Sequence, residues 1–422
     1  MTANPEPLST SILRGDLRKL ALTTLLLYAL TMTAAVPAAQ AQTFTVLHSF
    51  TRLPTGFGPR SGLVPDGTGS RYGTTSNDAN GGSAYELTHG PSGWVVSTVT
   101  EFAHDGNGYA PMSRLTLGPD GALYGTTQYG GTPGSCGGLG CGAIFRLNPS
   151  AAYSRTTIYR FSGPDGYWPA GELTFDRTGD IFGTTLAGGA YGGGTVFELV
   201  RNSNGWTESV IHGFDGSNDG GELMGGVIID PAGNLYGTAY FGGDRTCLCG
   251  LVFELSPSAG SWSYRELHVF QGAADGAWPK NGLIMDGSGN LYGTTSDQGP
   301  FGGSGTVFEL SPSGDYWNLT TIRGFSGGSG TNPGPAGGVI LDASGNLYGT
   351  TYATGFYGQG SVFELTPIAG GWNYTTLHDF FDLIHDGQYP VGNLLRDTHG
   401  DIFGTTSQGG DYGGGTVWEI TP

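Results

Sequence analysis

The residues of this sequence best suited to acid–base chemistry are glutamates and basic residues that recur at a fixed spacing. A carboxylate beside an imidazole can serve as a general acid and base. Because the pattern returns in most copies of a repeat, we expect it to belong to the scaffold, with the two side chains opposed across neighbouring strands. The expected pairs are Glu198–His212, Glu254–His268, Glu309–Arg323, Glu364–His378 and, across the two ends of the chain, Glu419–His48.

A second recurring phrase combines aromatic rings with carboxylates, as in DGYWPAG at 165–171 and DGAWPKNG at 275–282. Such residues suit a glycan ligand, because aromatic faces stack on sugar rings and carboxylates accept hydrogen bonds from hydroxyl groups. The alternative, which we favour, is that each aromatic–proline pair fills the gap between neighbouring repeats. The candidate ligand-binding residues are Tyr109, Trp168, Trp278, Tyr389, Asp105, Asp165, Asp275 and Asp386. Aromatic residues also recur in the glycine-rich loops, and we expect them on the same face: Tyr191, Phe301, Tyr357 and Tyr412.

All four cysteines fall in two glycine-rich loops, Cys136 and Cys141 in GSCGGLGCG and Cys247 and Cys249 in TCLCG. An even number of cysteines in an exported chain indicates disulfides. Pairing within each loop is the simplest assignment, since the loops belong to repeats that are not neighbours. A zinc or other soft-metal site is disfavoured because no histidine lies near these cysteines. We predict no metal and no cofactor.

Sequence motifs for catalysis are scarce. The chain has no His-Glu-x-x-His, and Lys280 sits in WPKNG rather than in a phosphate-binding loop. A hydrolase or lyase acting on carbohydrate would need two carboxylates from different repeats to converge, which sequence spacing does not show.

The elements that position these residues are set by a repeat of 52 to 58 residues, centred on Tyr-Gly-Thr-Thr or a variant of it. Each copy has four short segments rich in β-branched and aromatic residues and bounded by Gly, Asn, Asp or Pro. Four antiparallel strands repeated seven times predict a seven-bladed β-propeller. The copies begin at Tyr72, Tyr124, Phe182, Tyr236, Tyr292, Tyr348 and Phe403.

The ends of the repeat region predict how the ring closes. The region begins with a fourth strand, Thr43–Phe50, and stops after a third strand, Thr416–Ile420. We expect these two segments to pair, so that the first strand completes the last blade and no edge is left exposed.

Residues 1–41 are expected to form a signal peptide, with a basic start and an apolar run from Leu20 to Val36. Cleavage after Ala41 leaves a single domain, 42–422, that is secreted or periplasmic and has no membrane span. The formal net charge of −18 disfavours nucleic acid and anionic membrane surfaces as partners. We expect a monomer.

The phrases Gly-Asn-Leu-Tyr-Gly-Thr-Thr and Gly-Thr-Val-Phe-Glu-Leu, complete in Gly289–Leu310, resemble the GloVer-motif extracellular tandem-repeat family of bacterial secreted proteins. The resemblance covers residues 43–422. It implies no activity, cofactor or catalytic residue. Related proteins often carry an anchoring signal after the repeats, whereas this chain stops at Pro422, so we expect free secretion or a periplasmic location.

Together these patterns predict an exported, non-catalytic binding module whose ligand is an extracellular polysaccharide or protein. The alternatives are a carbohydrate-active hydrolase or lyase and a structural protein of the cell surface.

Overall fold

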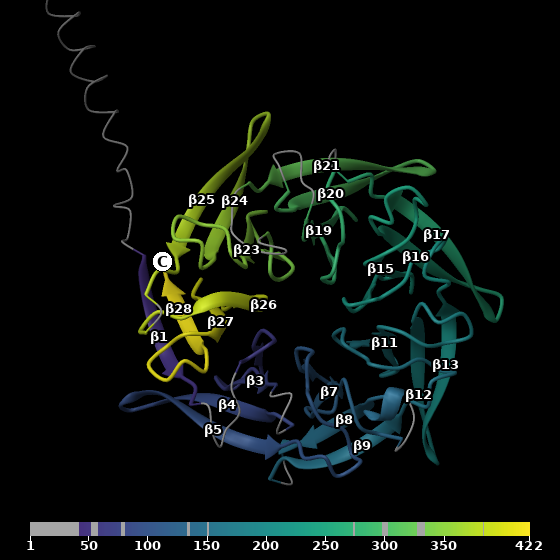
Figure 1. Cartoon of the computed structure of the whole chain (residues 1–422), viewed down its shortest axis with the longest axis horizontal. Helices are drawn as coiled ribbons and strands as arrows, with labels where there is room; N and C mark the ends of the chain where they lie inside the picture. The colour runs from purple at the N-terminus through teal and green to yellow at the C-terminus, as the bar shows by residue number, and fades with distance from the viewer. Residues whose placement is uncertain are drawn as a thin grey trace, which may run out of the picture. The chain divides into compact units, whose positions relative to one another are not determined.

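Seven four-stranded antiparallel sheets follow one another in a ring, which confirms the predicted seven-bladed β-propeller (Figure 1). This computed structural model describes residues 42–51, 58–76, 81–132, 136–149, 152–272, 275–297, 303–326, 334–382 and 384–422. The predicted signal peptide and Phe301 lie outside the described residues. The propeller itself is one compact unit, Phe44–Thr421.

In each blade the four strands lie side by side, with the first strand nearest the centre of the ring and the fourth at its outer edge (Figure 1). The first strands are β2 (Val64–Pro65), β6 (Thr116–Leu117), β10 (Thr174–Phe175), β14 (Ile228–Ile229), β18 (Ile284–Met285), β22 (Ile340–Leu341) and β26 (Gln388–Arg396). The second strands are β3 (Arg71–Thr75), β7 (Leu123–Thr127), β11 (Ile181–Thr185), β15 (Leu235–Ala239), β19 (Leu291–Thr295), β23 (Leu347–Thr351) and β27 (Ile402–Gln408). The third strands are β4 (Ser83–Gly90), β8 (Ala143–Asn148), β12 (Thr195–Asn202), β16 (Leu251–Ser258), β20 (Thr306–Ser313), β24 (Ser361–Ile368) and β28 (Thr416–Thr421). The fourth strands are β5 (Gly93–Glu101), β9 (Ser154–Arg160), β13 (Gly205–Gly213), β17 (Ser261–Val269), β21 (Tyr316–Gly324), β25 (Gly371–Asp379) and β1 (Thr43–Ser49).

Helical structure is minimal in the described part of the chain. It consists of one 3₁₀ turn, η1 (Cys136–Gly138). No helix there has the length and apolar character needed to cross a membrane.

The seventh blade combines both ends of the repeat region. Its strands follow the order β1-β28-β27-β26, so the N-terminal strand takes the outer edge that the last repeat leaves open. The backbone N–H of Phe50 donates to the carbonyl of Gly415 at 2.9 Å just beyond the end of β1.

The Asp-x-x-Gly-Asn phrase forms the turn between the first and second strands. In the fifth blade, Asp286 Oδ1 accepts hydrogen bonds from the backbone N–H groups of Ser288 (2.8 Å) and Asn290 (2.9 Å), and Gly289 has a φ of 85°. Burial alone would raise the pKa of Asp286, but the bonds from Asn290 and Ser288 lower it. The carboxylate therefore closes the turn, while glycine supplies the left-handed backbone that the turn requires.

The glycine of Tyr-Gly-Thr-Thr makes room for an aromatic ring. Gly293 pairs with Phe308 of the next strand, and a Cβ at this glycine would lie 2.5 Å from the Phe308 ring. The glycine and the ring of Gly-Thr-Val-Phe-Glu-Leu are therefore complementary, which explains why the two phrases recur together.

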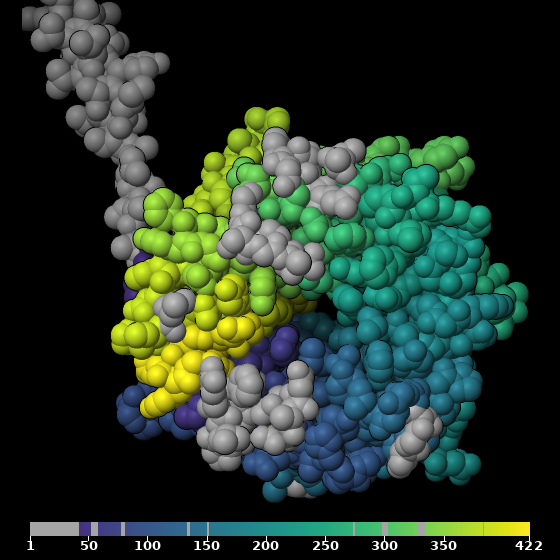
Figure 2. Space-filling model, viewed as in Figure 1, coloured from purple at the N-terminus to yellow at the C-terminus, as the bar shows by residue number. Residues whose placement is uncertain are grey.

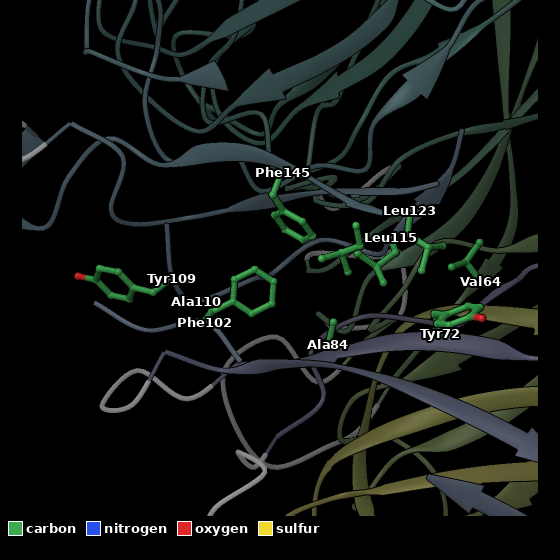
Figure 3. Packing of buried hydrophobic residues seen from close by; sticks show 10 residues of the cluster. Val64, Tyr72, Ala84, Phe102, Tyr109, Ala110, Leu115, Leu123 and Phe145 are labelled. Atoms are coloured by element: carbon green, nitrogen blue, oxygen red, sulfur yellow. The ribbon is translucent and has the colours of Figure 1, made fainter. Parts of the chain in front are cut away.

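The aromatic ring at this position of the third strand also packs against a phenylalanine from the preceding blade. Phe102, which follows the fourth strand of the first blade, packs edge-on against Phe145 of the second blade with ring centroids 4.8 Å apart, and both rings lie in the core (Figure 3). The same contact recurs at every blade junction, with centroid distances of 4.8 to 5.8 Å. The partners at the ring closure are Phe50 and Tyr85, so the contact also links β1 to the first blade.

The two threonines of the phrase have separate roles. Thr294 Oγ1 donates to the carbonyl of Gly337 in the next blade at 3.2 Å, whereas Thr295 Oγ1 bonds to Thr306 Oγ1 within its own blade at 2.9 Å. Equivalent bonds from the first threonine, such as Thr184 to Gly225 and Thr405 to Ser61, join other neighbouring blades. The repeated phrase is therefore scaffold.

Candidate binding site

The connections between blades lie beside the loops that join second and third strands. Backbone N–H groups of Tyr109, Tyr167 and Ala277 donate to carbonyls of the Tyr129, Ala187 and Asp297 loops at 2.7 to 3.0 Å. We call this end of the propeller the loop face. The predicted aromatic phrase lies on it.

The aromatic residues of that phrase bridge neighbouring blades. Trp168, Trp278 and Tyr389 have φ values of 57° to 60°, and each backbone N–H donates to a carbonyl of the preceding blade at 2.8 to 2.9 Å. Their rings contact aromatic residues of that blade, for example Tyr389 on Tyr352 with centroids 4.8 Å apart. Tyr109 is buried and contacts the His104 ring at 3.9 Å. These contacts support the role between repeats rather than a ligand platform.

The loops that carry the cysteines supply the carbonyls to which Trp168 and Trp278 donate. Cys141 and Cys249 accept the N–H groups of Trp168 and Trp278. Cys136 is joined to Cys141, with Cα atoms 5.2 Å apart, and Cys247 is paired with Cys249 in the other loop. Both tryptophans therefore pack against the blade whose loop carries a cysteine pair.

The aspartates of the aromatic phrase pair with side chains of the preceding fourth strand. His268 Nε2 lies 2.7 Å from Asp275 Oδ2, and His378 Nε2 lies 2.9 Å from Asp386 Oδ1. Tyr159 of the preceding fourth strand bonds to Asp165 at 2.5 Å, whereas Asp105 pairs at 3.1 Å with Arg155, which comes from the fourth strand of the following blade. The carboxylates proposed for a ligand therefore have partners within the scaffold.

These contacts correct the predicted glutamate–histidine pairs. Glu198 lies opposite Ser209 and His212 lies opposite Val196, so the two residues are not cross-strand partners. His212 Nε2 instead contacts Asp219 Oδ2 at 3.0 Å. The same register separates Glu254 from His268, Glu309 from Arg323 and Glu364 from His378.

The glutamates bond to the tyrosine of Tyr-Gly-Thr-Thr instead. The hydroxyl groups of Tyr236, Tyr292 and Tyr348 lie 2.9 to 3.3 Å from Glu254, Glu309 and Glu364. At the ring closure, burial and then Asp401 raise the pKa of Glu419, which also interacts with Arg71. His48 contacts the Phe50 ring edge-on at 4.8 Å, and burial lowers its pKa.

One pair of carboxylates from different blades does converge. Asp165 and Glu208 both accept from the Tyr159 hydroxyl, at 2.5 and 3.2 Å. Burial, followed by the charge of Asp165, raises the pKa of Glu208 to about 7. Neither carboxylate lines either of the two cavities described below.

Exposed aromatic residues gather on the sixth and seventh blades. Ring centroids of Phe356 and Tyr357 lie 4.9 Å apart, and those of Tyr357 and Phe381 lie 5.4 Å apart. We call these three residues the aromatic patch; their exposed fractions are 84%, 54% and 58%. The sequence analysis named Tyr357 but missed Phe356 and Phe381. Their signal in the sequence is the occurrence of two pairs of adjacent aromatics in one repeat, Phe356-Tyr357 and Phe380-Phe381.

Two cavities of the described part of the propeller bear on the search for a site. One, of about 410 Å³, lies between turns of the third and fourth blades, at Phe175–Arg177 and Ile229–Gly233. The other, of about 620 Å³, is lined by residues from all seven blades and lies at the centre of the ring, where Figure 2 shows a hollow.

Comparison with known proteins supports the fold. The family model described as the Gloeobacter/Verrucomicrobia repeat matches residues 31–247, 135–303 and 226–422. No curated protein sequence matches the chain. A Bacteroides fragilis protein proposed to be a 6-phosphogluconolactonase is similar in structure, with 14% identity over 81% of this chain and 89% of that one, and a TM-score of 0.52. A Bacteroides thetaiotaomicron protein of unknown function matches with 12% identity over 90% of this chain and 76% of that one, and a TM-score of 0.46.

Proposed function

Because the chain belongs to the Gloeobacter/Verrucomicrobia repeat family, whose repeats build the propeller scaffold here, we propose that function resides in residues that depart from the repeat. The chain is an exported, non-catalytic binding module, and its aromatic patch recognises an extracellular glycan. Export rests on the predicted signal peptide, residues 1–41, with cleavage after Ala41.

The observation that carries this proposal is the exposure of three contiguous aromatic rings. Phe356, Tyr357 and Phe381 touch one another yet remain more than half exposed, although the fold buries aromatic side chains at every blade junction. Contiguous exposed apolar surface on a folded protein marks an interaction site.

The neighbouring charges favour a sugar as the ligand. Asp379 accepts the backbone N–H of Phe356 at 3.3 Å, and Asp382 pairs with the exposed His385 at 2.8 Å. Carboxylates beside aromatic rings can accept hydrogen bonds from sugar hydroxyls while the rings stack on the apolar face of the sugar. This combination favours glycan over an apolar protein segment.

The test is a polysaccharide-binding array followed by calorimetry on the best ligand. Replacing Phe356 and Tyr357 with alanine should weaken binding at least tenfold, because both stacking surfaces are lost. Tyr316→Ala is the control, since Tyr316 is also an exposed aromatic but lies at the start of β21, outside the aromatic patch.

Three results would count against the proposal. These are no binding to any polysaccharide, unchanged affinity in the double variant, and recognition of a protein alone. Release of reducing ends from a bound polysaccharide would overturn the non-catalytic assignment and favour the hydrolase or lyase alternative.

A further inference from the structure

The central cavity is built from equivalent positions of the seven blades. In each blade three successive residues lead from the loop face to a buried leucine or valine. Examples are Arg60–Gly62 before Leu63 and Met224–Gly226 before Val227. The first of these positions lies nearest the loop face, and we call the seven such residues the outer ring. The third position forms the inner ring.

The inner ring is glycine in four blades, and close packing of backbones requires glycine at two of these positions. A Cβ at Gly62 would lie 1.9 Å from the carbonyl oxygen of Asn393, and one at Gly226 would lie 2.3 Å from that of Glu172. The other three blades place Arg114, Glu172 and Asn393 at this level. The cavity therefore breaks the symmetry of the repeat.

The one carboxylate of the cavity lining is already neutralised by neighbours. Glu172 Oε2 lies 3.8 Å from Arg114, and Glu172 Oε1 accepts from the side-chain amide of Asn393 at 3.0 Å. Asn393 comes from the seventh blade and Glu172 from the third, so this bond spans the cavity. The carboxamide oxygen of Asn393 accepts the N–H of Gly338 at 2.7 Å, which fixes its orientation.

The outer ring carries positive charge alone. Its charged members are Arg60 and Lys280, and the other five positions are Ala, Met or Val. Among the described residues, neither cation has a carboxylate within ion-pair distance. Burial lowers the pKa of Lys280, partly opposed by Asp297, as expected for an ammonium group that has lost water without gaining a bonded partner.

We propose that the central cavity binds the oxyanion group of a ligand, a carboxylate, phosphate or sulfate, with the exposed Arg60 and the half-buried Lys280 of its lining as donors. Arginine and lysine are the usual protein donors to such groups. Within a chain of net charge −18, cations without a carboxylate partner favour the binding of an anion beside them. This site is independent of the aromatic patch.

The experiment is calorimetric titration of the folded protein at low ionic strength with phosphate, sulfate and glucuronate, and with glucose as the uncharged control. At least one anion should bind, glucose should not, and added sodium chloride should weaken the interaction. Which anion binds most tightly distinguishes a carboxylate sugar from a phosphorylated or sulfated one.

Arg60→Gln with Lys280→Gln should reduce the affinity at least tenfold, with an unchanged thermal midpoint. Arg177→Gln with Arg201→Gln is the matched control, because it removes two exposed cations outside the cavity and should leave the affinity within twofold. The proposal is overturned if none of the three anions binds, or if both double variants lose affinity equally. The double variant Phe356→Ala with Tyr357→Ala should retain anion binding. If the aromatic patch proves not to bind glycan, the result of the anion titration is therefore unaffected.

Discussion

At the scale of single residues, the glycine of Tyr-Gly-Thr-Thr is fixed by its neighbour rather than by its backbone angles. Gly293 faces the Phe308 ring across the β19–β20 pair, and the Leu283 side chain closes the remaining space. Any side chain at this position must displace a buried ring.

Gly293→Ala should therefore lower the free energy of unfolding by about 1 to 3 kcal/mol, the usual cost of overpacking a core. Gly287→Ala is the matched control, because a Cβ at Gly287 meets no atom within 4 Å. That control should change stability by no more than about 0.5 kcal/mol. Guanidinium denaturation of both variants measures the difference, and equal stabilities would contradict the packing account.

The Glu208 carboxyl provides a pH-dependent prediction. Its pKa is raised from 4.5 to about 7, so in that pH range the folded state holds a proton that the unfolded state has released. Stability contributed by this group is complete below pH 4.5 and is lost as the pH rises towards 7. Glu208→Gln should remove this dependence, with a gain on the order of 1 kcal/mol at pH 8 after allowance for solvent screening.

Thermal melts of the native chain and Glu208→Gln between pH 4 and 8 measure the effect. Glu266→Gln is a useful comparison, because burial and Asp219 also raise the pKa of Glu266 on the equivalent strand of the next blade. Parallel pH profiles for the native protein and Glu208→Gln would show that this carboxyl is not responsible.

At the scale of elements, a recurring aromatic contact joins each blade to the next, and threonine hydroxyls join several neighbouring blades. Phe214 packs on Phe253 at 5.1 Å between the third and fourth blades, and Phe50 packs on Tyr85 at the same distance where the ring closes. The two junctions are chemically similar, although one joins consecutive repeats and the other joins β1 to the first blade.

Phe50→Ala should therefore cost as much as Phe214→Ala, about 3 to 5 kcal/mol each, because both remove a buried ring. Phe381→Ala, which removes an exposed ring, should change stability little. Chemical denaturation of the three variants measures this. A harmless Phe50→Ala beside a costly Phe214→Ala would mean that the closing junction contributes little.

At the scale of the whole molecule, ring closure converts seven similar blades into one cooperative unit. Deleting residues 43–50 removes β1, exposes the edge of β28 and leaves Tyr85 without its partner ring. We expect a marked loss of stability and a broader unfolding transition, because an open array of repeats unfolds from its ends. Calorimetry and gel filtration measure both effects; an unchanged, single sharp transition would refute a structural role for β1.

The sequence by itself determined the blade and the number of blades. Asp286 and Gly289 predict a turn, and the residues of Leu291–Thr295 and Thr306–Ser313 predict strands. Seven copies at a regular spacing predict a propeller, because that arrangement buries every blade. Each of these signals depends on residues that are close together in the sequence, so the sequence alone is enough to recognise it. The aromatic patch and the central cavity could not be predicted in the same way, and only Tyr357 of the aromatic patch was named from the sequence.

Only the tertiary structure decided which charged groups meet. His212 contacts Asp219 rather than Glu198 because the register of the β12–β13 pair places His212 opposite Val196, and the spacing of residues in the sequence does not show that register. Glu172 and Asn393 are 221 residues apart and meet across the central cavity, while Arg60 and Lys280 gain their common environment from the ring. Contacts of this kind depend on how blades are placed around a centre, and that placement is a property of the closed fold.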